Sequence, residues 1–407
     1  MTSPPLSERS RVMPASPIRR LAPYADAARA RGVKVLHLNI GQPDIESPEI
    51  VMERLRSFPG RYVPYGPSQG QPEMVDGFRR YYRKLGFELG AENIFVTTGG
   101  SEAALIAFLV LFNPGDEILV PEPFYTNYNG FAVMADVRLV PVTTRVEDGY
   151  RLPPAAEIES RVTGRTRGLL VCSPNNPTGT VYSPEDWEMV RDLARRRGLF
   201  LVSDEAYREF VYDGPAPAQS ALSLAGIEDR VVVVDSLSKR LSLCGARVGA
   251  LVTRNTAVWQ AALKVGQARL CSPSAEQYAA AALPDVPQAY TERVREEYRR
   301  RRDLVYDALS GISGVVCRKP SGAFYICARL PVGSAEDFAI FLLEGFQEGG
   351  ATVMVAPNDG FYATPGRGKD EIRIAYVLEE RALAQAMGIL RSGLEAYSKQ
   401  APAGKVP

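Results

Sequence analysis

Between residues 93 and 236 the sequence alternates short apolar runs with segments of helical periodicity. The apolar runs are found in "NIFVTT", "DEILVPE", "RGLLVCS", "LFLVSDEAY" and "RVVVVDS", and helical patterns such as "SPEDWEMVRDLARRRG" lie between them. Such alternation predicts a doubly wound, mostly parallel sheet. Strands that helices cover on both faces are continuously apolar, as "GLLV", "LFLV" and "VVVV" are. We therefore expect an α/β fold with helices on both faces of a central sheet.

The chain of 407 residues is too long for one simple core, because single cores stop growing at roughly 250 to 300 residues. Near residue 283 the pattern changes to a long charged helix, followed by the strand-like pieces "GAFYICARL", "ATVMVAP" and "EIRIAYVL". This change predicts a second, smaller α+β domain. We expect an N-terminal segment (1–64) that joins the small domain, a large domain (65–282) and a small C-terminal domain (283–407).

The charge of the chain is balanced, with 48 lysines and arginines against 47 aspartates and glutamates and no long block of either sign. It therefore gives no reason to expect a nucleic-acid or membrane partner, and a small-molecule ligand is expected. The N-terminus lacks the apolar core of a signal peptide, and the longest apolar run, Ala103 to Phe112, is about half of a membrane span. We expect a soluble, cytoplasmic protein.

The chemistry of any site is limited by a single histidine, His37, which lies in an apparent strand and is expected to pack there. One histidine argues against catalytic triads and histidine metal sites, so proton transfer needs another base. The five cysteines occur singly without C-x-x-C spacing. We expect them to be reduced, mostly packing residues, and we expect no metal site.

Ligands of open parallel sheets lie outside the carboxyl ends of the strands, so the residues directly after each apolar run are the candidates for a site. After "IFVTT" the chain passes through Gly99 and Gly100 to Ser101 at the start of a helix, where backbone N–H groups can bind a phosphate. A tight turn with Ser101 as the helix N-cap is the alternative. A dinucleotide fingerprint is a further rival, but its G-x-G-x-x-G spacing is absent.

Three further strand ends carry polar groups. "CSPNNPTGTVYS" holds Asn176 in a loop, and "LFLVSDEAYREF" places Asp204 at a strand tip with Tyr207 three residues later. Each pattern alone has a structural alternative: a purely structural loop, a carboxylate that caps a helix, or a surface lysine. The last strand end, in "VVVVDSLSKRLSLCGARVG", carries four polar residues: Ser236, Ser238, Lys239 and Arg247.

Together the four strand ends fit one ligand with four features. The glycine turn and Arg247 suit a phosphate, and Asp204 suits a cationic ring nitrogen. Asn176 and Tyr207 suit a phenolic oxygen, and the amine of Lys239 suits an electrophilic carbon. Pyridoxal 5'-phosphate has all four features.

The motifs "PNNPTG", "SDEAY" and "SLSKRLSLCGARVG" make the sequence resemble the class I/II aminotransferases, which are fold type I pyridoxal-phosphate enzymes. The resemblance covers nearly the whole chain, from "SPIRRLAPYADAA" to "EIRIAYVLEE". It is strongest to the bacterial aspartate aminotransferases, notably in "HLNIGQPDI", "PEPFYTNYNGFA", "SGAFY" and "TPGRGKDEIRIAY". We therefore expect a PLP-dependent transferase of fold type I.

The resemblance implies a role for each residue that matches a family motif. Lys239 forms the internal Schiff base with the cofactor and carries a proton from the substrate's Cα to C4'. Asp204 pairs with the ring nitrogen, Asn176 and Tyr207 bond the phenolic oxygen, and Tyr125 stacks on the ring. The resemblance further assigns the phosphate to seven residues: Gly99, Gly100, Ser101, Ser236, Ser238, Arg247 and Tyr65.

By the same resemblance, Tyr65 reaches the phosphate from a second subunit, which implies a homodimer with shared active sites. Arg373 matches the arginine that binds the substrate α-carboxylate, while Gly41 adds a backbone contact and Asn176 lies beside the substrate. The implied reaction moves the amino group of an L-amino acid, aspartate first, to 2-oxoglutarate by a ping-pong mechanism. No metal is expected.

Several alternatives to this function remain open at the level of sequence. Alanine or broad specificity, or a lyase of the same fold, would use nearly the same cofactor residues. A pyridoxal-binding regulator domain is disfavoured, because the aminotransferase motifs begin almost at the N-terminus. A nicotinamide-dependent dehydrogenase is a further rival, and it would show no absorbance from a lysine-bound cofactor.

Recognition of a distal carboxylate is the weak point of the aspartate hypothesis. Related bacterial enzymes use a lysine just after the glycine turn, where this chain has Ser101. We expect Arg269, in "GQARLCSPS", to bind the distal carboxylate instead, with a structural ion pair as the alternative. Arg19 and Arg20, in "SPIRRL", are the other candidates.

Overall fold

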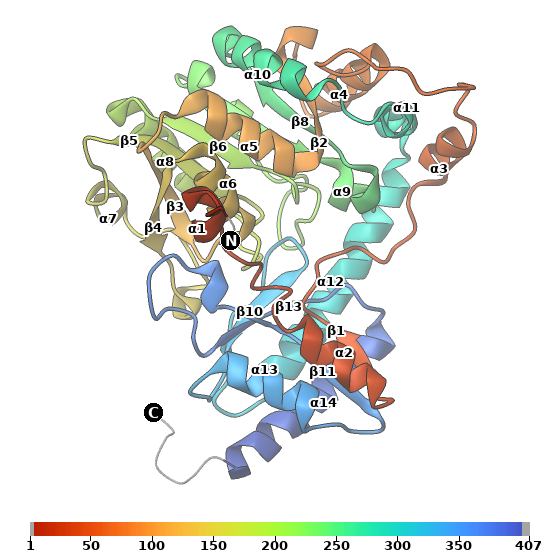
Figure 1. Ribbon diagram of the computed structural model, residues 1–407, viewed down its shortest axis with the longest axis vertical. Coiled ribbons are helices and arrows are strands. Elements are labelled where there is room, and N and C mark those ends of the chain that lie inside the picture. Colours follow the sequence, from red (N-terminus) through yellow and green to blue (C-terminus); the bar gives the residue numbers. More distant parts are fainter. Residues whose placement is uncertain (1–3, 401–407) are drawn as a thin grey trace.

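The computed structural model of the protein describes residues 4–400 and consists of a larger and a smaller part (Figure 1). Within these residues, the larger part holds a seven-stranded sheet, and the smaller part holds a four-stranded and a two-stranded sheet. The long helix α12 (Gln288–Ser310) runs from the larger part to the smaller part (Figure 1). None of the described helices is long and apolar enough to cross a membrane.

The seven-stranded sheet is mostly parallel, as the sequence predicts. Its pairs among β3, β4, β5, β6 and β7 are all parallel, whereas β8 is antiparallel to both of its neighbours. The carboxyl ends of β5, β6 and β7 therefore meet at one edge. The strands, in spatial order, are β2 (Ile94–Thr98), β8 (Val248–Thr253), β7 (Val231–Ser236), β6 (Phe200–Asp204), β5 (Thr166–Cys172), β3 (Glu117–Glu122) and β4 (Arg138–Thr143).

The four valines of β7 show why these strands are continuously apolar. Val232 and Val234 pack into the core on one face of the sheet, and Val231 and Val233 pack into the core on the other. One core includes α5 (Gly99–Leu111), α6 (Asn127–Ala135) and α10 (Thr256–Arg269). The other includes α4 (Pro72–Lys84), α8 (Pro184–Arg197) and α11 (Ser274–Ala280).

Helix α8 illustrates how local sequence sets the element boundaries. The Ser183 hydroxyl accepts a bond of 3.2 Å from the Asp186 N–H, and the Asp186 carboxylate accepts one of 2.9 Å from the Ser183 N–H. This capping box and Pro184 at the first helical position start the helix. Gly198 ends it in the left-handed region, at φ +66°, where glycine has no steric penalty.

The smaller part combines N-terminal and C-terminal segments. Strand β1 (Lys34–His37) pairs in parallel with β11 (Ala351–Met354), so the N-terminal segment is built into this part. The four-stranded sheet contains β12 (Ala356–Pro357), β13 (Glu371–Ala375), β10 (Tyr325–Arg329) and β9 (Val316–Cys317). Its helices include α2 (Ala22–Ala30), α13 (Ala335–Glu344) and α14 (Glu380–Gln400). The domain boundaries at 64/65 and 282/283 stay predictions.

Four short helices complete the fold. Helix α9 (Leu237–Arg240) follows β7 directly, α3 (Glu49–Arg56) packs against α11, and α1 (Glu8–Val12) lies against α6. Helix α7 (Ala155–Glu159) packs near α8. The N-terminal segment therefore contacts the larger part as well as the smaller one.

Candidate active site

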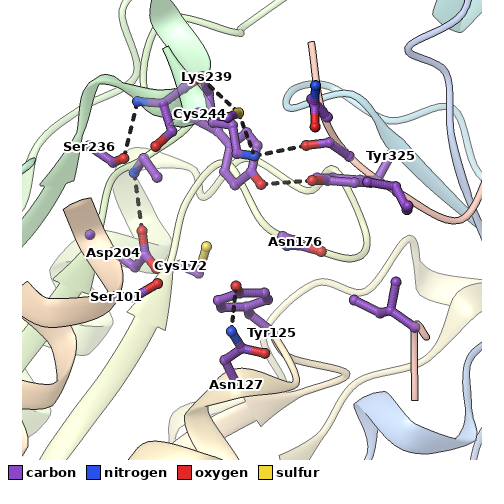
Figure 2. Close-up of a pocket in the computed structure, with 18 of the residues that line it drawn as sticks. Ser101, Tyr125, Asn127, Cys172, Asn176, Asp204, Ser236, Lys239, Cys244 and Tyr325 are labelled. Carbon is purple, nitrogen blue, oxygen red and sulfur yellow. Dashed lines mark hydrogen bonds between the residues drawn. The ribbon is translucent and has the colours of Figure 1, made fainter. Parts of the chain in front are cut away.

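A cavity of about 510 Å³ lies at the carboxyl ends of β5, β6 and β7. The N-terminal segment forms one wall, and Tyr325 and Arg373 from the smaller part form another. Figure 2 shows residues from these separate elements pointing toward one space. The lining includes most of the residues that the sequence singles out: Gly41, Gly100, Ser101, Tyr125, Asn176, Asp204, Tyr207, Ser236, Ser238, Lys239, Arg247 and Arg373.

Lys239 lies in α9, one turn beyond the end of β7. The Ser236 hydroxyl begins this turn by accepting a bond of 3.2 Å from the Ser238 N–H. The Lys239 Nζ donates to the Gly41 carbonyl at 2.8 Å and lies 3.7 Å from the Cys244 Sγ (Figure 2). Burial lowers the pKa of the Lys239 amine, so its neutral, nucleophilic form is reached at lower pH than in a solvent-exposed lysine. Cys244 is one of two cysteines that line the cavity, whereas the cysteines were expected to be mostly packing residues.

A buried ionic cluster fixes the turn that carries Lys239. The Arg240 guanidinium pairs with the Asp235 carboxylate, and Tyr82 Oη donates to that same carboxylate at 2.7 Å. Arg208 pairs with Glu205 at 2.7 Å and lies 3.7 Å from the Asp235 carboxylate. All four charged side chains are buried. Because leaving a buried charge unpaired is costly, this cluster holds β7 and α9 in one arrangement.

Asp204 ends β6 with its carboxylate at the cavity. The Tyr128 hydroxyl donates to Oδ2 at 2.7 Å, and the Ala206 N–H donates to Oδ1 at 3.1 Å. Burial nevertheless raises the pKa of the Asp204 carboxyl, because desolvation outweighs these two bonds. A cation placed against Asp204 would lower this pKa and favour the ionised carboxylate, and a protonated ring nitrogen would be such a cation.

Tyr128 is a site residue that the sequence reasoning missed. It lies on α6, three residues after Tyr125, and its ring packs edge-on against the Tyr125 ring with centroids 5.5 Å apart. Tyr125 lies just before this helix, which begins at Asn127, and the three-residue spacing between the two tyrosines was the available signal. Tyr125 itself is oriented by Asn127, whose amide donates to the Tyr125 hydroxyl at 2.8 Å (Figure 2).

Asn176 and Tyr207 each contact a residue of the smaller part. The hydroxyls of Tyr207 and Tyr325 lie 2.8 Å apart, and the Asn176 side-chain oxygen accepts from Arg373 Nη1 at 3.1 Å. The Asn176 amide nitrogen donates to no side chain or carbonyl of the described residues and remains able to donate into the cavity. Tyr325, another residue missed from sequence, thus joins the two parts at the site.

The glycine turn and Arg247 form one end of the cavity. Gly99 has φ +75°, and a Cβ there would lie 2.4 Å from Arg247 Nη2, so the close approach of the guanidinium requires glycine. Arg247 also donates to the Cys244 carbonyl at 3.0 Å. The N-cap of α5 is Thr98, so the alternative with Ser101 as a plain N-cap is wrong. Gly100 and Ser101 begin the helix and line the cavity, where helical N–H groups bind anions.

Arg373 lies at the opposite side of the cavity, on β13, and is almost completely buried. Its Nη2 donates to the Asn39 carbonyl, and the rings of Tyr325 and Phe361 lie 4.7 and 4.8 Å from the guanidinium carbon. Its buried Nε has no hydrogen-bond partner among the described residues. Gly41 lies so near that a Cβ there would be 1.9 Å from the Tyr325 hydroxyl. The site therefore offers a fixed guanidinium whose Nε–H is an unpaired hydrogen-bond donor.

Three expected site residues do not line this cavity: Gly99, Arg269 and Tyr65. Arg269 pairs with Glu102 at 3.0 Å and donates to the carbonyls of Val96 and Ser68 at 2.9 and 3.2 Å. This is the structural ion pair that was the alternative to substrate binding, because Glu102 supplies the nearest carboxylate. Tyr65 is 82% exposed and lines a second, open hollow. That hollow shares Ser101 and Arg247 with the cavity and also contains Arg269, Val63 and Met134.

Pyridoxal 5'-phosphate fits the groups that the structure brings together. The glycine turn and Arg247 would hold its phosphate, Asp204 would pair with its cationic ring nitrogen, and the amine of Lys239 would bond to its aldehyde carbon. These matches rest on the buried carboxylate, the space kept open by Gly99, and the lowered pKa of Lys239. The fold and the site are those of a pyridoxal-phosphate-dependent enzyme.

Comparisons with known proteins give the family. The sequence profile of the aminotransferase class I and II family matches residues 33–390, and the chain belongs to this family. The aspartate aminotransferase of Rhizobium meliloti (strain 1021) is 31% identical over 91% of this chain and 92% of its own. The arginine–pyruvate transaminase of Pseudomonas aeruginosa is 33% identical over 79% of this chain and 82% of its own.

A solved structure shows the same fold. The aspartate aminotransferase of Thermus thermophilus with maleate aligns with a TM-score of 0.86 at 30% identity, covering 96% of this chain and 100% of its own. Relatives with different substrates are therefore similar to this chain to a comparable degree. The choice of amino donor has to be argued from the residues of this site.

Proposed function

We propose that the protein transfers the amino group of an L-amino acid, aspartate first, to 2-oxoglutarate. The observation that carries the chemistry is the buried amine of Lys239, with its lowered pKa, on the same cavity as the buried carboxylate of Asp204. The aspartate aminotransferases among the relatives support aspartate as the donor. When bound, pyridoxal phosphate acts as a sink for the electrons left when a proton leaves the substrate's Cα.

Two residues of this chain, Lys239 and Arg373, act on the substrate in the proposed reaction, and a third, Asp204, acts on the cofactor. The Lys239 amine takes the proton from the substrate's Cα and delivers it to C4' of the cofactor, and burial assists this by lowering the pKa of the amine. Asp204 holds a positive charge on the ring nitrogen beside it. Arg373 binds the α-carboxylate with the planar donor fork that remains in part unpaired, and so orients the Cα–H bond.

The remaining contacts hold the cofactor in place. Gly99, Gly100, Ser101, Ser236, Ser238 and Arg247 would hold the phosphate, Asn176 and Tyr207 the phenolic oxygen, and Tyr125 the ring face. Because one cavity serves both half-reactions, the first 2-oxo acid leaves before the second enters, which is a ping-pong cycle. Parallel lines in double-reciprocal plots of initial rate test this order, and intersecting lines would refute it.

The homodimer is a further part of the proposal. The exposed apolar side chains of Val63, Tyr65 and Met134 line the hollow that adjoins Ser101 and Arg247. A second copy seated there would cover this apolar surface and bring its own Tyr65 toward the phosphate end of the cavity. Sedimentation analysis is expected to give twice the chain mass, and a monomer at micromolar concentration would refute the shared site. The cytoplasmic location also stays a prediction.

A panel of amino donors tests the proposed reaction. Purified holoenzyme is incubated with 2-oxoglutarate and aspartate, glutamate analogues, alanine, aromatic or basic amino acids, and glutamate formation is measured. We expect aspartate to give the highest kcat/KM. Higher values for alanine or for many donors would select the alternative specificities. Donor consumption with ammonia release in place of glutamate would select a lyase.

A further inference from the structure

Aspartate carries a second carboxylate, and the expected partners for it are occupied or missing. Ser101 is uncharged, and Arg269 is held by Glu102 outside the cavity. Arg20 pairs with Glu336 at 2.9 Å and with Asp359 at 2.6 Å, which commits its guanidinium to the smaller part. A distal carboxylate therefore needs another cation.

Four cationic side chains line the cavity, whereas Asp204 is the one carboxylate that lines it among residues 4–400. Lys239, Arg247 and Arg373 have the tasks described above. The fourth cation is Arg19, which is exposed. In the part of the chain that the structure describes, its guanidinium makes no ion pair and no hydrogen bond. Arg19 is thus a cation on the cavity wall without an anion of its own.

The position of Arg19 is tied to that of Arg373 through one buried residue. The Asn39 side-chain amide donates to the Ile18 carbonyl at 3.0 Å, directly before Arg19. The backbone carbonyl of Asn39 accepts from Arg373 Nη2. The buried Asn39 therefore bonds directly to Arg373 and to the residue before Arg19, and both arginines line the same cavity. The ion pairs of Arg20 anchor the other side of this short segment to the smaller part.

We propose that Arg19 binds the side-chain carboxylate of the amino donor and selects dicarboxylic substrates. This inference rests on the proposed transamination and names the residue that sets its specificity. One guanidinium then receives each end of the substrate: Arg373 the α-carboxylate and Arg19 the distal carboxylate. A guanidinium suits this task because its planar donor fork matches both oxygens of a carboxylate. Its exposed, flexible stem allows it to follow donors of four or five carbons.

The test compares Arg19→Ala with Arg269→Ala in the holoenzyme. The quantity measured is the ratio of kcat/KM for aspartate to kcat/KM for alanine, which cancels general damage to the site. We expect Arg19→Ala to lower this ratio by roughly 10- to 150-fold, the range for losing hydrogen bonds to a charged group. Arg269→Ala should leave the ratio within about twofold. Arg19→Lys, which keeps the charge but not the fork, should recover part of the loss.

A binding measurement supplies a readout that does not depend on turnover. Calorimetry of the holoenzyme with succinate and, as a monocarboxylate control, butyrate gives the two affinities. Arg19→Ala should reduce the affinity for succinate relative to butyrate by the same factor as it reduces the kinetic ratio. Cofactor content and circular dichroism verify that each variant is folded, and Arg19→Gln serves if the alanine variant is not.

The outcomes separate the two proposals. Suppose that the wild-type enzyme uses aspartate well and that Arg19→Ala leaves the aspartate-to-alanine ratio of kcat/KM unchanged. This result would overturn the role of Arg19 and leave the proposed reaction intact. The same is true if Arg269→Ala lowers the ratio and Arg19→Ala does not. A wild-type enzyme that transaminates alanine but neither aspartate nor glutamate would overturn the dicarboxylic substrate itself.

Discussion

The two sides of the cavity are built in different ways. The strand-end side, formed by Asn176, Asp204 and Lys239, consists of side chains that are buried or nearly so and that hydrogen bond to neighbours. The N-terminal wall, residues 16–20, is held by Asn39 and by the ion pairs of Arg20, and it presents the exposed guanidinium of Arg19. Cofactor chemistry thus depends on a rigid, buried sheet edge. In the proposed reaction, the choice of substrate depends on the partly exposed segment of residues 16–20.

Removing the amine of the strand-end side should give the largest effect. Lys239→Ala is expected to reduce kcat for every amino donor by about 10⁴-fold or more, because it removes the proton carrier of both half-reactions. Lys264→Ala, at an exposed position on α10, is the matched control. Single-turnover kinetics provide the measurement. A Lys239→Ala variant with activity within tenfold of the wild type would show that another base acts.

Removing Arg373 should be the next largest effect, and it should extend to all donors. Arg373→Ala is expected to lower kcat/KM for both aspartate and alanine by roughly 10- to 150-fold, because every amino acid carries an α-carboxylate. Arg19→Ala, in contrast, should affect dicarboxylic donors selectively. If Arg373→Ala lowered kcat/KM for aspartate alone, the two arginines would have the opposite assignment.

The hydrogen bond between Tyr128 and Asp204 tests how much the buried neighbours of the strand-end side contribute to cofactor affinity. Tyr128→Phe removes the donor at 2.7 Å and leaves the Asp204 carboxylate with one fewer bond to its charged form. We expect cofactor affinity to fall by about tenfold, the lower end of the range for a hydrogen bond to a charged group. The ratio of kcat/KM for aspartate to kcat/KM for alanine should stay constant. Equilibrium dialysis of pyridoxal phosphate measures the first quantity. An unchanged affinity would remove Tyr128 from the positioning residues.

The smallest effect concerns the thiol beside Lys239. Burial lowers the pKa of the Lys239 amine, and the contact with Cys244 partly opposes this by stabilising the ammonium form. Cys244→Ala should therefore lower the pKa of Lys239 further, so that the neutral amine exists at lower pH. The pH profile of cofactor uptake by the apoenzyme is expected to move to lower pH. A shift to higher pH would contradict the assigned direction.

The strand-end side could be predicted from the sequence because it depends on local order. Each polar residue directly follows an apolar run, and parallel strands bring their carboxyl ends to one edge, so Asp204 and Lys239 had to meet. The hydrogen bond from Tyr128 to Asp204 joins residues far apart in the chain, and no residue adjacent to Asp204 in the sequence indicates it. Sequence spacing alone likewise could not tell that Glu102 engages Arg269, because that contact depends on how α5 and α10 pack.

The N-terminal wall also depends on tertiary contacts that the sequence could not predict. The sequence "SPIRRL" offers two adjacent arginines, and which of them faces the cavity depends on Glu336 and Asp359, which come from the other end of the chain. The structure resolves this choice by pairing Arg20 and leaving Arg19 on the cavity. The family could therefore be inferred from motifs, whereas the residue proposed for substrate choice emerged only from tertiary contacts.

The proposed reaction requires that the sheet edge delivers Lys239 to the cofactor aldehyde. Sodium borohydride makes a lysine's bond to an aldehyde permanent, so the reduced holoenzyme can be digested and its peptides weighed by mass spectrometry. We predict the added mass of the cofactor on the peptide that contains Lys239, and its absence when the enzyme is first treated with excess aspartate. Cofactor mass on a different lysine, or on none, would contradict the assignment of Lys239 as the residue that bonds the cofactor.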